Sequence, residues 1–145
     1  MIDKIELENI ELYSKKNSKR ITTLRNGRQI LLSSQKYLEN EQIILELLSL
    51  HRKQWKNMIK NAPIPLKIHF VIYRKTRKIA DTNNILQGLF DCMVEAGWLE
   101  DDNGWIFCPI YHPLQYDKNN PRVIMWLDEP NLTLQEQFNK YIKDK

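Results

Sequence analysis

Three aspartates, Asp81, Asp101 and Asp102, lie in a stretch of the 145-residue chain where the charge reverses. Residues 81–102 contain six acidic side chains and no lysine or arginine. Carboxylates that lie close together raise one another's pKa unless a cation compensates their charge. Mg²⁺ prefers such oxygen ligands and retains bound waters, which leaves room for a phosphate group and an attacking hydroxide. The pattern indicates a divalent-metal site for phosphodiester hydrolysis.

The same aspartates have a simpler interpretation, and their spacing does not decide between the two. Aspartate is a preferred N-cap of helices, which suits Asp81, and it is common in turns, which suits Asp101 and Asp102. A helix over residues 83–96 would be about 21 Å long and would separate the two groups. Only a crossover that returns the next strand beside the preceding one could bring Asp102 towards Asp81.

Basic residues gather in two blocks, one before the helix expected at 35–60 and one that begins near the C-terminal end of that helix. The net charge is +4 with a pI near 9.0, and residues 13–28 and 52–78 contain no acidic side chain. Segregated positive charge favours a polyanionic partner such as nucleic acid. The alternative is a set of solvated faces whose charges neutralise each other in the fold.

Hydrophobic periodicity and turn signals predict an α+β protein that forms a single domain over residues 1–145. The expected fold is a small mixed β-sheet covered by two main helices, with a C-terminal helix after a Thr133 cap. Asn26-Gly27 predicts a two-residue hairpin turn, and Gly97 is expected to end the second main helix. Strands are expected at 5–13, 29–32, 66–73, 105–110 and 122–127, and the main helices at 35–60 and 83–96.

The compartment is expected to be the cytoplasm. No apolar run approaches the roughly 20 residues that cross a bilayer, and the acidic N-terminal residues lack the pattern of a signal peptide. Cys92 and Cys108 are too far apart for a CxxC motif, and we interpret them as reduced core thiols. The protein is thus expected to have no membrane partner.

The other reactive side chains give weaker indications of catalysis or binding. His69 lies in an apolar strand and is interpreted as structural, and no serine or cysteine has a convincing base beside it for covalent catalysis. Trp98 and Trp105 flank the acidic turn. They can pack in the core, which is the more common role, or stack on unpaired bases.

The order of these motifs resembles that of the RusA-type Holliday junction resolvases of phages and prophages. A D-x-D-N run opens a helix in that family, a further aspartate lies within the helix, and a D-D pair follows it. Here D-T-N-N at 81–84, Asp91 and E-D-D-N at 100–103 occupy those places. The basic stretch at 14–20 and the turn at 117–122 are also similar, so the resemblance covers about residues 12–127.

The resemblance, to the Gram-positive phage branch of this family, implies a RusA-like fold and a homodimeric endodeoxyribonuclease. Such an enzyme nicks opposing strands of branched, four-way DNA and requires Mg²⁺, for which Mn²⁺ can substitute. Asp81 and Asp102 match metal ligands, with Asp101 in support and Asn83 as a neutral ligand. The implied DNA contacts are Lys15, Lys16, Lys19, Arg20, Arg74, Lys75, Arg77 and Lys78.

Two residues depart from the family pattern. Asn83 stands where a second aspartate is expected, and Gln87 stands where a lysine is usual. The first change removes one negative charge from the metal site, and the second removes a cation that could stabilise the transition state. The alternative function is therefore a catalytically attenuated protein that binds branched DNA. A phage regulatory protein without DNA affinity is a third possibility.

Overall fold

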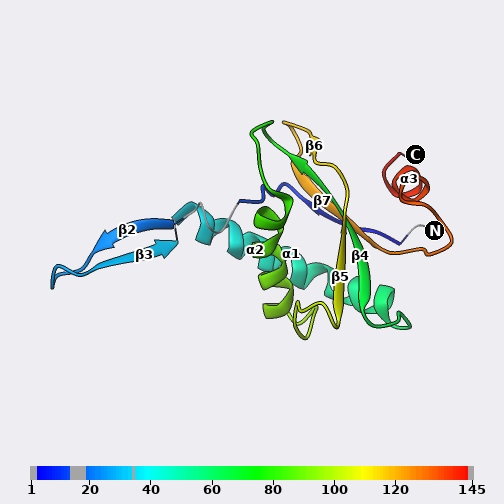
Figure 1. Ribbon diagram of the computed structural model, residues 1–145, viewed down its shortest axis with the longest axis horizontal. Helices are drawn as coiled ribbons and strands as arrows, with labels where there is room; N and C mark the ends of the chain where they lie inside the picture. Colours follow the sequence, from blue (N-terminus) through cyan, green and yellow to red (C-terminus); the bar gives the residue numbers. More distant parts are fainter. Residues whose placement is uncertain (1–2, 14–18, 34, 144–145) are drawn as a thin grey trace.

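The computed structural model describes residues 3–13, 19–33 and 35–143, with the backbone alone at 19–22 and 30–33. Its centre is a mixed sheet in the strand order β1-β7-β4-β5 (Figure 1). Pairing is antiparallel between β1 and β7 and between β7 and β4, and parallel between β4 and β5. A short β6 pairs parallel to the end of β4. The strands are β1 (Ile5–Glu8), β4 (Leu66–Arg74), β5 (Phe107–Tyr111), β6 (Gln115–Tyr116) and β7 (Arg122–Leu127).

Two helices, α1 (Gln35–Ile59) and α2 (Thr82–Glu95), pack against one face of this sheet. Strand β4 alternates, so that Ile68, Phe70 and Ile72 enter the core shared with the helices. The buried residues of α1 recur at spacings of four and seven, which places them on one helix face: Tyr37, Ile44, Leu48 and Trp55. The main hydrophobic core therefore lies between the sheet and α1 and α2.

The connection β4-α2-β5 forms a crossover that returns β5 beside β4, as expected for parallel neighbours. Gly97 follows the helix with a φ of 77°, in the left-handed region that glycine adopts without a steric penalty. The NH of Trp98 donates to the Met93 carbonyl at 2.8 Å and completes the helix end. The prediction for Gly97 is confirmed.

The other face of the sheet is covered by the C-terminal segment, α3 (Leu134–Phe138) and the single π-helical turn η2 (Asn139–Lys143). Thr133 caps α3 in a reciprocal capping box with Glu136, as the sequence predicts for this cap. Trp126 of β7 stacks on Tyr141, with ring centroids 4.7 Å apart. A smaller hydrophobic cluster thus holds the terminal helix on the sheet.

Strands β2 (Lys19–Thr23) and β3 (Gln29–Ser33) form a separate hairpin that extends beyond the N-terminal end of α1 (Figure 1). Leu24 and Arg28 close its turn through the Leu24 NH and the Arg28 carbonyl, so three residues lie between them. Gly27 has a φ of 83°, whereas Asn26 is not left-handed. The predicted hairpin is confirmed, but its two-residue turn is wrong because only one residue adopts positive φ.

The α+β class and the mixed sheet with two main helices and a C-terminal helix are confirmed. Two strand ends differ from expectation by more than one residue. The first strand stops at Glu8 because Asn9 turns the chain with a φ of 57°. The strand expected from residue 105 begins at Phe107 because the preceding residues form a turn whose Asn103 carbonyl accepts the NH of Ile106. In the described part of the chain, no helix combines the length and apolarity needed to span a membrane.

Candidate functional site

Asp81 lies at the N-terminus of α2, beyond the C-terminal end of β4. One oxygen of its side chain accepts the NH of Asn83 at 2.9 Å, and its backbone carbonyl accepts the NH of Ile85. Asp81 is therefore the N-cap of α2, and its other carboxylate oxygen is not needed for the cap. Burial raises the pKa of Tyr111, the last residue of β5, and the negative charge of Asp81 raises it further.

Asp101 and Asp102 lie in the exposed turn between α2 and β5. The Asp101 carboxylate accepts the side-chain NH₂ of Asn103 at 2.7 Å and the NH of Asp102 at 2.9 Å. These bonds, with the Asn103 side chain first, hold the pKa of Asp101 below its usual value. Asn103 in turn accepts the NH of Trp105. Asp101 thus shapes the turn, and Asp102 is left exposed on its surface.

The two groups of aspartates do not meet within one chain. Helix α2 has 14 residues, about 21 Å at 1.5 Å per residue, with Asp81 at its first end and Asp102 beyond its second (Figure 1). The crossover makes β5 parallel to β4, so the residues before β5 lie beside the start of β4. Among the described residues no three acidic, histidine or cysteine side chains form a group that could hold a metal ion. The described fold therefore leaves Asp81 and the Asp101–Asp102 turn of one chain apart, and we refer to these two acidic groups as the two half-sites.

Each half-site nevertheless retains carboxylates that the fold does not neutralise. Some acids of the protein form ion pairs with basic residues, such as Glu11 with Arg74, Asp117 with Arg122 and Glu129 with Lys140. Among the side chains that the structure describes, no ion pair involves Asp81, Asp101 or Asp102. Exposed carboxylates without a positive partner are suited to bind a cation from solution.

A basic depression lies where the end of β4 meets β6. Its lining includes Arg77, Lys78 and Tyr116, and its volume is about 440 Å³. The Arg77 guanidinium lies 4.3 Å from the centre of the Tyr116 ring, a cation–π contact that orients it. Lys75, Arg77 and Lys78 are all exposed. The expected basic segment therefore leads directly to Asp81 and can contact phosphates.

Arg74 differs from its neighbours. Its Nε donates to the Glu11 carboxylate at 3.1 Å, and the Lys75 NH donates to the other Glu11 oxygen at 2.8 Å. Both charged side chains are nearly buried. Arg74 thus anchors the segment after β1 to the sheet, and the prediction that it contacts DNA does not fit this position.

The N-terminal contacts expected from the resemblance are only partly described. Lys15 and Lys16 lie outside the described residues. Lys19 and Arg20 open β2, where their backbone pairs with Ser33 and Leu32 of β3. These two residues therefore belong to the hairpin and not to the segment that leads to Asp81.

An exposed edge joins the two half-sites along α2. Asn83 and Gln87 are one helical turn apart and both exposed, so they lie on one stripe of the helix. At the Asp81 end, Ile79 is fully exposed, and at the Asp102 end Trp105 is 87% exposed. Trp98 is instead buried and stacks on Trp55, as the more common role of such tryptophans predicts. Trp105 remains available for a partner.

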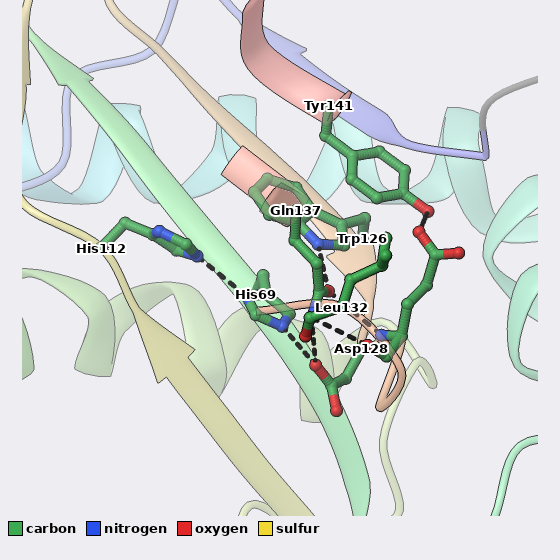
Figure 2. A network of polar contacts seen from close by, with 8 residues as sticks. His69, His112, Trp126, Asp128, Leu132, Gln137 and Tyr141 are labelled. Carbon is green, nitrogen blue, oxygen red and sulfur yellow. Dashed lines mark hydrogen bonds and ion pairs between the residues drawn. The ribbon is translucent and has the colours of Figure 1, made fainter. Parts of the chain in front are cut away.

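A buried polar network on the opposite face was not predicted (Figure 2). His69 Nε2 lies 2.7 Å from Asp128 Oδ1, and His69 Nδ1 lies 2.8 Å from His112 Nε2. Gln137 donates to the same Asp128 oxygen at 2.9 Å and accepts from the Trp126 indole. His69, which the sequence presents as structural, is completely buried in this network. Its polar character within an apolar strand was the available signal, but partners 43 and 59 residues away could not be read from the sequence.

The hydrogen bonds assign the tautomers of both histidines. The Asp128 carboxylate can only accept, so His69 Nε2 carries a proton, and neutral His69 then accepts at Nδ1 from His112 Nε2. Burial, the largest cause, lowers the pKa of His69, and burial with the neighbouring His69 lowers the pKa of His112 to about 4. The network is therefore a neutral histidine pair that fastens the C-terminal segment to the sheet, and it lacks a nucleophile.

The chain matches no family model, and no curated protein matches it in sequence.

Proposed function

We propose that the protein is a metal-dependent endodeoxyribonuclease that acts on branched DNA, such as four-way junctions, in the cytoplasm of a bacterium that carries a phage or prophage. The observation that carries this proposal is the division of three unneutralised aspartates between the two ends of α2. The exposed basic residues that shortly precede Asp81 in the chain support it, because they can bind the phosphate backbone of DNA.

A two-fold homodimer would complete the site. If two copies place their α2–β5 edges side by side and antiparallel, Asp81 of each copy approaches Asp102 of the other. A two-fold axis then produces two equivalent metal sites, as the cutting of two opposed strands requires. The exposed apolar residues at the two ends of α2 favour this arrangement, because Ile79 of one copy would cover Trp105 of the other.

Pairing through side chains is favoured over a continuous sheet. Strand β5 is the edge of the main sheet, but its Pro109 has no backbone NH to donate. The exposed stripe of α2 with Asn83 and Gln87 would therefore provide much of the contact, and it would bring Asn83 to the completed site.

The residues present fit Mg²⁺ only in such a composite site. Asp81 and Asn83 from one copy and Asp102 from the other would supply oxygen ligands, while Asp101 holds the turn of Asp102. When bound, the metal would lower the pKa of a water molecule and polarise the phosphate. Lys75, Arg77 and Lys78 would position the DNA backbone, and the departures at Asn83 and Gln87 would reduce the rate without removing the site.

A mixing experiment tests the composite site. Asp81→Asn and Asp102→Asn are each expected to abolish Mg²⁺- or Mn²⁺-dependent nicking of a labelled four-way junction. When the two variants are mixed and allowed to exchange, a heterodimer contains one site with both aspartates and one with neither. Activity should return to about a quarter of the wild-type level, since half of the dimers carry one intact site of two.

The outcomes separate the alternatives. No recovery on mixing, with subunit exchange verified, would exclude the composite site. Tight junction binding without product at any metal concentration would instead identify a branched-DNA-binding protein that has lost cleavage, which Asn83 and Gln87 favour. Absence of binding to both junction and duplex at moderate salt would exclude both functions.

A further inference from the structure

The β2–β3 hairpin is a structural feature that the proposed cleavage site does not use. Within the described residues, neither strand pairs with the main sheet, and the hairpin lies beyond the end of α1, away from α2 (Figure 1). A single two-stranded hairpin is at best marginally stable in water. A partner molecule would therefore stabilise this arm, which we define as residues 19–33.

The charge of the arm identifies the kind of partner. Lys19, Arg20, Arg25 and Arg28 lie in it, and no acidic residue occurs between Glu11 and Glu39. Two such arms would repel one another, so a dimer contact between arms is disfavoured. A polyanion would instead gain from every positive charge through the release of its counterions.

The tip of the arm presents its cations to solvent. All residues from 23 to 29 are exposed. The turn is held by the Leu24 NH on the Arg28 carbonyl and by the Arg28 NH on the Asn26 side chain, at 2.8 and 2.9 Å. These bonds use backbone groups of Arg28, and within the described residues neither Arg25 nor Arg28 makes an ion pair. Both guanidinium groups are free to bind phosphate oxygens, with which they form paired hydrogen bonds.

The dimensions of the arm fit duplex DNA. Strands of five residues extend about 17 Å, and the B-DNA major groove, about 12 Å wide, admits a two-stranded β-ribbon. We propose that the β2–β3 arm enters the major groove of a duplex arm of the DNA substrate, with Arg25 and Arg28 at its tip on the phosphate backbone. The identity of this polyanion as DNA rests on the proposed function.

The test measures binding of a fluorescent four-way junction over a series of salt concentrations, without divalent metal so that no cleavage occurs. Arg25→Ala with Arg28→Ala should weaken binding about tenfold, as expected for two exposed charge contacts. The slope of log affinity against log salt should fall by about 1.8, since each phosphate contact contributes about 0.9. Lys140→Ala with Lys143→Ala removes two cations from the C-terminal turn, outside both basic blocks, and should leave affinity and slope unchanged.

Charge reversal strengthens the test. Arg25→Glu with Arg28→Glu should weaken binding more than the alanine pair, while both variants retain the far-UV circular dichroism of the wild type. If the wild type binds DNA and the alanine pair keeps its affinity and slope, the arm proposal is wrong and the proposed function stands. If the pair converts a dimer to a monomer, the arm contacts a second copy and the proposal is also wrong. A wild type that binds no DNA would overturn the proposed function itself.

Discussion

His69 on β4 donates its Nε2 proton to Asp128, 2.7 Å away and just beyond β7. This bond joins the central strand to the segment that leads into the C-terminal helix. Because it also directs the other nitrogen of His69 to His112, this bond determines the tautomers of both rings.

The first prediction concerns stability in acid. Burial lowers the pKa of His112 from 6.5 to about 4, and the pKa of His69 is lowered as well, so unfolding increases proton uptake. The free energy of unfolding therefore keeps its full value above pH 6.5 and decreases progressively as the pH falls towards 4, because the unfolded histidines bind protons that the folded ones do not. Urea unfolding at a series of pH values measures it. His51→Gln, on the surface of α1, should leave the curve unchanged, and a wild-type curve that is flat from pH 7 to 5 would contradict the assignment.

The second prediction concerns the acceptor at position 128. Asp128→Ala leaves a buried NH of His69 without a partner, which should lower the free energy of unfolding by about 1–3 kcal/mol. Asp128→Asn preserves an oxygen where His69 and Gln137 both donate, so it should cost less. Equal destabilisation by the two substitutions would show that the carboxylate charge, rather than the hydrogen bond, matters.

The third prediction separates the capping role of Asp81 from its proposed role as a ligand. Asparagine is as good an N-cap as aspartate, so Asp81→Asn should keep the thermal stability, whereas Asp81→Ala should lose about 1 kcal/mol. Both substitutions should abolish metal-dependent nicking. Retained activity in the stable Asp81→Asn protein would leave Asp81 with a structural role alone.

The fourth prediction concerns the dimer contact. Ile79→Ser with Trp105→Ser replaces two exposed apolar side chains and should weaken dimerisation at least tenfold without lowering monomer stability. Analytical ultracentrifugation measures the association. Leu50→Ser, which changes another exposed apolar residue, on α1, is the matched control. An unchanged dimer would place the interface elsewhere.

The fifth prediction concerns the neutral residue at position 83. Asn83→Asp adds a carboxylate on the exposed side of α2, two residues after the cap. It should lower the Mg²⁺ concentration that half-saturates cleavage, because a further negative ligand strengthens cation binding. Isothermal titration with Mn²⁺ provides an independent measure. If neither affinity nor activity rises, Asn83 does not lie in the metal site.

Sequence periodicity was sufficient to predict the α+β fold, the two main helices and the hairpin. The spacing of Tyr37, Ile44 and Leu48 needs only one buried helix face, and Gly97 needs only a left-handed residue at a helix end. Both signals are local. The turn after Leu24 was misjudged because Asn26-Gly27 is compatible with more than one loop length, and hydrogen bonding across the strands selects among them.

The sequence alone also determined where the acidic and the basic segments lie along the chain. Only the tertiary structure decided what they can form. The parallel crossover places Asp81 and Asp102 at opposite ends of α2, because a helix between parallel strands separates the end of one from the start of the next. The tertiary structure also decided that Arg74 pairs with Glu11 and His69 with Asp128. These residues are 63 and 59 positions apart, and their contacts depend on how the strands are ordered in the sheet.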